Sequence, residues 1–182
     1  RILIYLLEYM DKIVVRSKKK LIEEICNVLK TDGNSADLNH IDTSRITDMS
    51  GLFWNSKFNG DISRWNTGKV VNMAFMFYGS KFNGKIGSWD THNVADMHGM
   101  FMDSSFNQDI DRWDVRNVVN MVSMFDTSVF NQSIGKWGVE KVKYVNSMFA
   151  NSKFDQDISD WNIESLEDLY GLFCESEFKH SI

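Results

Sequence analysis

The sequence contains only two cysteines, Cys26 and Cys174, among 182 residues. They form no spacing pattern, so neither a disulfide framework nor a zinc site is predicted. The sequence also lacks an apolar run long enough to cross a membrane, and we expect no membrane span. Its length and its 43% hydrophobic content instead indicate one domain with a single continuous core.

Basic residues do not outnumber acidic residues in the sequence. Lys and Arg together number 20 against 25 Asp and Glu, which gives a formal net charge of −5. Binding to nucleic-acid phosphates relies on a basic surface. We therefore expect no nucleic-acid partner.

Motifs for catalysis or metal binding are absent as well. The sequence has no glycine-rich phosphate loop, no GxSxG elbow and no Cys–His arrangement. The four histidines show no HxxxH or HxxH spacing, and the acidic clusters at 109–111 and 157–160 do not match a calcium loop. A glycan-cleaving enzyme would need two carboxylates in one cleft, for which Asp109 and Asp157 are the candidates. Since almost every polar feature recurs along the chain, we predict no enzyme, cofactor or metal site.

What the sequence does contain is a repeat. A phenylalanine opens a new repeat every 24 residues, without insertion or deletion, at Phe58, Phe82, Phe106, Phe130, Phe154 and Phe178. Each Phe is followed four residues later by Ile, and in the five complete repeats Trp, then Val or Leu, then Met, Val or Leu come at fixed distances, before a Met-Phe or Leu-Phe pair near the end of the repeat. A fixed period of this size indicates stacked supersecondary units, each contributing to a shared core. We expect the five repeated tryptophans, Trp65, Trp89, Trp113, Trp137 and Trp161, to line up in a row.

Two periodicities inside each repeat predict its local structure. The segment FNQDI, residues 106–110, has polar residues on each side of a buried Ile and indicates a short strand that ends where Trp begins a turn. The Val, Met, Met and Phe that follow are spaced i, i+3, i+6 and i+7, like one face of a short helix. Asn93 with Asp96, and Ser165 with Asp168, occupy the expected helix start. The predicted fold class is an α/β repeat, a leucine-rich-repeat-like right-handed solenoid with one short parallel strand and one short helix per 24 residues.

The chain divides into two parts. Residues 1–36 are predicted to be an N-terminal capping segment, in which 12–15 form a strand and 17–30 an amphipathic helix with Ser17 as N-cap and Gly33 near its end. Residues 1–10 lack the unbroken apolar run and the cleavage site of a signal peptide, and we expect them to pack on the first repeat as a strand or helix. Residues 37–182 are predicted to form the repeat array, with units 37–57, 58–81, 82–105, 106–129, 130–153, 154–177 and the partial unit 178–182.

The predicted strands present polar side chains at fixed outward positions. One column reads Asp61, Lys85, Asp109, Ser133 and Asp157, and a second reads Arg64, Ser88, Arg112, Lys136 and Asp160. Opposite charges therefore lie side by side at Asp61/Arg64 and Asp109/Arg112. A third column, from Asn59 to Asn131, is typical of side chains that bond to neighbouring backbone. The candidate protein-binding residues on this strand face are Asp61, Arg64, Lys85, Asp109, Asp111, Arg112, Lys136, Asp157 and Asp160.

The sequence ends at FKHSI, five residues into a further unit. Phe178 and Ile182 would begin a strand whose outer edge is unpaired, and such edges favour aggregation. We expect either that the chain is a fragment of a longer array or that something covers this edge. A second copy of the chain, by self-association through the edge, is one such cover.

The repeat pattern FNxDIxxWDVxNVxxMxxMF, present as FNQDIDRWDVRNVVNMVSMF, resembles the BspA-like leucine-rich-repeat proteins of bacterial surfaces. The resemblance covers residues 12–182, with Gly138 and Tyr144–Val145 as the main departures. It implies a noncatalytic protein-binding module, cell-surface or secreted, of the adhesion type, that binds a host or cell-surface protein. The alternative is a structural spacer or self-associating scaffold within a larger protein.

Overall fold

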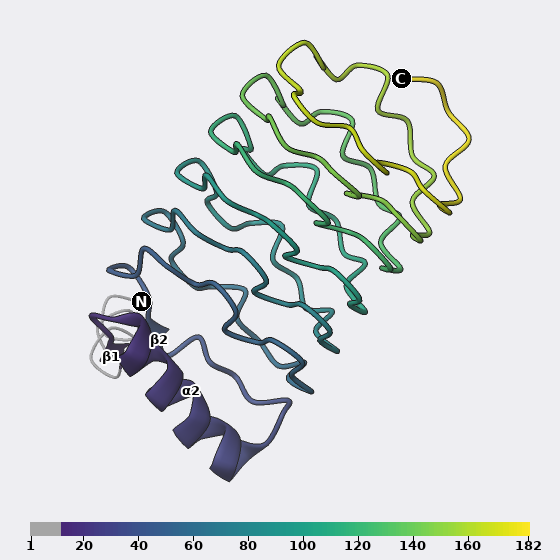
Figure 1. The fold of residues 1–182 in the computed structure, drawn as a ribbon. Coiled ribbons are helices and arrows are strands. Elements are labelled where there is room, and N and C mark those ends of the chain that lie inside the picture. The colour runs from purple at the N-terminus through teal and green to yellow at the C-terminus, as the bar shows by residue number, and fades with distance from the viewer. Residues whose placement is uncertain (1–11) are drawn as a thin grey trace, which may run out of the picture.

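The computed structural model describes residues 12–182 (Figure 1). Its regular elements are strand β1 (Ile13–Val14), helix α2 (Lys18–Asp32) and strand β2 (Ile41–Asp42). The prediction made for residues 1–10 lies outside the described residues. The three elements gather at one end of the molecule, and the rest of the chain runs away from them in successive turns.

Helix α2 begins and ends as its capping residues predict. The Ser17 side chain accepts a hydrogen bond from the backbone N–H of Lys20, which satisfies one free donor of the first turn. Gly33 follows the helix with a φ of 75°, in the left-handed region that glycine tolerates, and its N–H donates to the carbonyl of Leu29. Leu21 and Ile25 are buried in the common core. The apolar face of the helix therefore packs against the first turns of the chain.

Strands β1 and β2 pair in parallel, with Ile13 opposite Ile41 and Val14 opposite Asp42. The strand predicted at residues 12–15 is thus present at Ile13–Val14. This pair joins the N-terminal segment to the first turn of the repeated region.

Beyond Asp42 the chain winds in turns that lie side by side (Figure 1). We call each 24-residue turn a coil. Parallel bridges join equivalent residues of successive coils, at Asp48, Asn72, Asp96, Asn120, Tyr144 and Asp168. The 24-residue period of the sequence is therefore the spatial period of the structure.

The segments predicted as helices are runs of turns. In the segment 71–79, the backbone N–H groups of Met73, Phe75 and Phe77 donate to carbonyls of the next coil, while those of Met76 and Tyr78 donate to carbonyls three residues back. Beyond its first turn, an α-helix bonds each N–H to the carbonyl four residues back, whereas here the bonds alternate between the next coil and the carbonyl three residues back. Each of these segments also contains two residues with positive φ, which an α-helix does not accommodate. The helix prediction is wrong in type, although the Val, Met and Phe positions on which it rests are nearly all buried.

The segments predicted as strands, such as 106–110, are not strands, although the first of them, 58–62, forms one parallel bridge from Asp61 to Asp37. An asparagine side chain takes the place of the backbone ladder between these segments. The Oδ1 atom of Asn83 accepts the N–H of Asn107, 2.9 Å away, and Oδ1 of Asn107 accepts the N–H of Asn131 at the same distance. The same bond recurs from Asn59 to Lys179. The predicted Asn column is confirmed, and its side chains join these segments from Asn59 onward.

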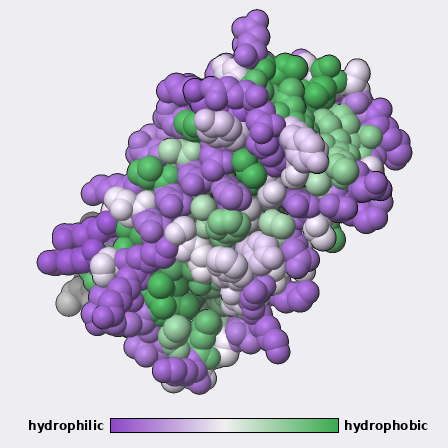
Figure 2. Space-filling model, in the orientation of Figure 1, coloured by the Kyte–Doolittle hydropathy of each residue, from purple (hydrophilic) through white to green (hydrophobic). Residues whose placement is uncertain are grey.

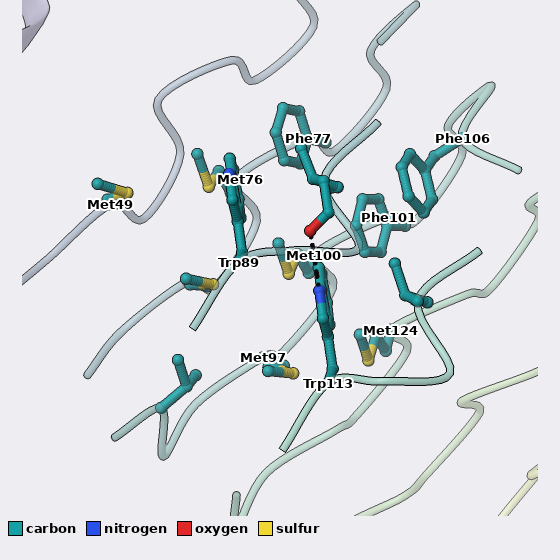
Figure 3. Packing of buried hydrophobic residues seen from close by; sticks show 14 of the residues in the cluster. Met49, Met76, Phe77, Trp89, Met97, Met100, Phe101, Phe106, Trp113 and Met124 are labelled. Atoms are coloured by element: carbon teal, nitrogen blue, oxygen red, sulfur yellow. Dashed lines mark hydrogen bonds between the residues drawn. The ribbon is translucent and has the colours of Figure 1, made fainter. Parts of the chain in front are cut away.

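The core consists of aromatic columns that run through the stack. One column has ring centroids 5.5–5.8 Å apart and comprises Phe53, Phe77, Phe101, Phe125, Phe149 and Phe173. The phenylalanines that open the repeats form a second column, whose rings lie 4.0–4.6 Å from the first. The five repeated tryptophans are buried, and Nε1 of Trp113 donates to the Ile86 carbonyl at 3.0 Å (Figure 3). The other four make the same bond, so the expected row of tryptophans is present.

The Asn column generates a stability prediction. Asn107→Ala removes the acceptor for the N–H of Asn131 and for Nε2 of Gln132, and should lower the free energy of unfolding by about 1–3 kcal/mol. Asn107→Asp keeps an acceptor oxygen, as Asp155 does at its own position in the column. It should therefore lower the free energy of unfolding by less than Asn107→Ala does. Urea unfolding measures both.

Ser133→Ala is the matched control, because that exposed side chain makes no hydrogen bond among residues 12–182. It should change the free energy of unfolding by less than about 0.5 kcal/mol. Equal unfolding midpoints for Asn107→Ala and Ser133→Ala would contradict a supporting role for the column.

Candidate functional site

The sequence-predicted site lies on the surface that we call the Phe-Asn face, formed by the outward side chains of residues 58–64, 82–88, 106–112, 130–136 and 154–160. The Asn column fixes how these segments stack, and the buried Ile and Trp anchor each of them. Eight of the nine candidate residues belong to the two outward columns of side chains and are exposed, and the ninth, Asp111, is half-buried. The structure thus places the candidates on one continuous, rigidly supported face.

The aspartates of this face hold turns. Oδ1 of Asp61 accepts the N–H of Ser63 at 2.8 Å, and Oδ1 of Asp157 accepts that of Ser159 at 2.9 Å. These backbone hydrogen bonds stabilise the charged carboxylates and lower the pKa of Asp61 and of Asp157. Asp109 makes the same bond to the N–H of Asp111. Part of the acidic column therefore shapes the backbone, in addition to any contact with a partner.

The basic residues of the face have different partners from those that the sequence suggests. Nη2 of Arg64 lies 3.9 Å from Asp37, not beside Asp61, and Nζ of Lys136 lies 2.7 Å from Asp111 of the preceding coil. This short bond raises the pKa of Lys136. Within residues 12–182, Arg112 makes no ion pair with Asp109 or with another carboxylate. The predicted side-by-side arrangement of opposite charges thus forms no ion pair at either position.

Two adjoining hollows form where side chains are small. Gly87 and Ser88 lie between the coils that carry Arg64 and Arg112, and both hollows are lined by Gly87, Ser88 and Asp109. Lys85 borders one hollow and Arg112 the other. Gly87 is required at this point, because a Cβ atom there would lie 2.4 Å from the carbonyl oxygen of Asp109. The structure therefore brings Lys85, Asp109 and Arg112 together, whereas Asp157 and Asp160 line neither hollow.

The described residues contain no arrangement suited to metal chemistry. No group of three His, Cys, Asp or Glu side chains converges within residues 12–182. His92 lies beside Asp90, with Nδ1 2.6 Å from Oδ1, while His98 lies against the ring of Phe75. Across the same residues, no helix has the length and apolar character to span a bilayer.

Sequence reasoning missed an aromatic cluster on another face, in which Trp54 is exposed and its two neighbours are half-buried. Trp54, Phe75 and Tyr78 have ring centroids 5.1–6.1 Å apart, and His98 adjoins Phe75 at 4.5 Å. Two signals could have revealed it. Trp54 is the one tryptophan outside the repeated Trp position, and Phe75 stands where the other repeats carry Gly or Ser.

Comparison with protein families gives one description. The family model described as "Mycoplasma protein of unknown function, DUF285" matches residues 23–128 and again residues 79–182. Two overlapping matches are consistent with a repeated sequence. No curated protein and no solved structure matches the chain significantly.

Near the Phe-Asn face, one ion pair generates a prediction about pH. The Arg116 guanidinium donates two hydrogen bonds to the Asp114 carboxylate, at 3.0 and 2.7 Å, and these bonds lower the pKa of Asp114 to about 2. Arg116→Ala should raise the pKa of Asp114 toward its ordinary value of about 3.9, as followed by NMR titration of the carboxyl carbon. Because the folded-state pKa is the lower one, the pair stabilises the fold above about pH 4, and this contribution is lost as the pH falls toward 2.

Arg112→Ala is the matched control, since Arg112 has no ion pair with Asp114. If the two alanine variants left the titration of Asp114 equally unchanged, the assigned cause would be wrong.

Proposed function

We propose that this chain, which belongs to the family described as Mycoplasma protein of unknown function, DUF285, is a noncatalytic module that binds a protein partner. The observation that carries the proposal is the contrast between constant inward and variable outward side chains. The inward Trp is the same in five successive repeats, while the outward position just before it reads Arg64, Ser88, Arg112, Lys136 and Asp160. A constant core with changing surface chemistry is typical of repeat proteins that bind other proteins.

The proposed architecture is a BspA-like, leucine-rich-repeat-like right-handed solenoid. Its support is the register of 24 residues between coils and the shared core of Phe, Trp and Met side chains. We further propose a cell-surface or secreted location with an adhesion role, on the strength of the resemblance of the repeat to BspA-like proteins.

The proposed contact surface is the Phe-Asn face around the two hollows. Lys85 and Arg112 border them and have no ion pair within residues 12–182. Their charges are therefore available to a partner without the loss of an existing bond. The concave surface formed by Gly87 and Ser88 gives a protruding side chain of the partner a place to enter.

Binding assays on immobilised extracellular-matrix proteins test this proposal. The double variant Lys85→Ser with Arg112→Ser should weaken binding to whichever matrix protein the unmodified chain binds by about tenfold or more, as expected for the loss of central interface charges. Its urea midpoint should stay close to that of the unmodified chain, because both side chains are exposed.

The matched control removes two positive charges elsewhere, by Lys57→Ser with Lys81→Ser. Both of these lysines are exposed and lie outside the Phe-Asn face. If both double variants weakened binding equally, the weakening would be due to the change in net charge. The Phe-Asn face would then no longer be assigned as the contact surface.

A second candidate function is self-association. The last coils expose apolar side chains around a hollow lined by Val145, Ile158, Trp161, Ile163, Leu166, Leu172 and Ile182. Figure 2 shows hydrophobic surface at that end of the molecule. Light scattering distinguishes the two candidates, because a scaffold that stacks end to end grows with concentration and a module that binds another protein does not.

A further inference from the structure

The aromatic cluster of Trp54, Phe75 and Tyr78 lies on what we call the turn face, the outward side chains of residues 47–55, 71–79, 95–103 and 119–127. Trp54 is 54% exposed, whereas the five tryptophans of the core are at most 9% exposed. Its indole stacks on the ring of Phe75 and meets the edge of Tyr78. Grouped exposed aromatic side chains mark contact sites on protein surfaces.

Phe75 is held in this cluster at a conformational cost. Its φ is 56°, in the left-handed region, which costs a residue with a side chain about 1–2 kcal/mol. The equivalent positions carry small residues, namely Gly51, Gly99, Ser123, Ser147 and Gly171. Gly99 leaves room for the ring, since a Cβ atom there would lie 2.5 Å from Cε1 of Phe75. A bulky residue kept in such a conformation on the surface favours a role in binding.

The turn face is acidic. The four segments contain no Lys or Arg, while they carry Asp48, Asp96, Asp103 and Asp126. Asp48 is paired with Lys18, and Oδ1 of Asp96 accepts the N–H of His98. Asp103 and Asp126 have no ion pair within residues 12–182. Two carboxylates on this face are therefore not neutralised by a neighbouring side chain there.

The aromatic and acidic residues lie along one line. The N–H of Asn55 donates to the carbonyl of Tyr78, that of Gly79 to Met102, and that of Asp103 to Asp126. These bonds put Trp54, Tyr78, Met102 and Asp126 at equivalent positions in four successive coils. With about 4.8 Å between hydrogen-bonded neighbours, the line from Tyr78 to Asp126 is about 10 Å long. We call Trp54, Phe75, Tyr78, Met102, Asp103 and Asp126 the aromatic–acidic stripe.

We propose that the aromatic–acidic stripe binds a basic segment of a protein partner. One Arg or Lys side chain of the segment stacks on the exposed ring of Trp54, beside the half-buried Tyr78, where a cation is attracted to the ring face. A second basic side chain reaches Asp103 and Asp126, about 10 Å further along. The stripe is separate from the Phe-Asn face and does not depend on the function proposed for that face.

Charge distinguishes this partner from a glycan. A neutral sugar would stack on the same rings and would donate its hydroxyl groups to the carboxylates, but it would bring no positive charge to balance theirs. The absence of Lys and Arg from all four segments adds to the attraction of a cation and adds nothing for a sugar. The observations therefore favour a basic peptide segment.

The experiment titrates the full chain with a tetra-arginine peptide and follows the calorimetric heat for every variant, with the total tryptophan fluorescence as a second signal wherever Trp54 is present. Trp54→Ala, and separately Asp103→Asn with Asp126→Asn, should each weaken binding by about tenfold, the size expected for one lost cation–π or charge contact. The tetra-citrulline peptide, which has nearly the same shape without the charge, should bind at least tenfold more weakly. Since both aspartates are on the surface, their double variant tests the stripe even if Trp54→Ala lowers stability.

Asp157→Asn with Asp160→Asn is the matched control, because it removes two exposed carboxylates from the Phe-Asn face. It should leave tetra-arginine binding unchanged. Equal weakening by the two Asp pairs would overturn the proposal in favour of nonspecific attraction to an acidic chain. Equal binding of tetra-citrulline, or binding of maltohexaose without tetra-arginine, would overturn it in favour of a neutral or glycan ligand.

Discussion

The structure depends on backbone hydrogen bonds between coils of equal length. In the turn segments, every second N–H donates to a carbonyl 23 residues ahead, as from Met73 to Asp96 and from Met97 to Asn120. A coil with one residue more or less would shift every such donor away from its acceptor. The columns of Phe, Trp and Asn follow from the same constraint, since equivalent residues meet only if every coil has 24 residues. Each coil thereby satisfies the polar backbone of its neighbour and also covers its apolar side.

Much of the fold could be predicted from the sequence, because it depends on spacing alone. The period, the row of tryptophans, the Asn column and the helix begun by Ser17 all follow from residue type and position. The local structure of the repeat could not be predicted in the same way. Apolar residues three and four apart suit a helix, but they suit a chain of three-residue turns equally well. The choice is made by hydrogen bonds to the next coil, which no single repeat encodes.

The candidate sites show the same division. The outward columns could be predicted, while the pairing of Lys136 with Asp111 and of Arg64 with Asp37 depends on distances between coils. The hollows arise because Gly87 has no side chain and Ser88 is small where the neighbouring coils carry Arg64 and Arg112. The aromatic cluster escaped prediction because its two signals, Trp54 and Phe75, lie in different repeats and outside the repeated Trp and Phe positions. Only the stacking of the coils brings the two rings to a centroid distance of 5.5 Å.

The most direct test of the equal-length constraint compares two deletions by urea unfolding. Removal of residues 106–129 takes out one whole coil and rejoins matching neighbours, so the shortened chain should unfold cooperatively with a smaller m-value, in proportion to the surface lost. Removal of residues 106–128 leaves one residue too many and should abolish cooperative unfolding or greatly weaken the stack. Similar unfolding curves for both deletions would contradict the account.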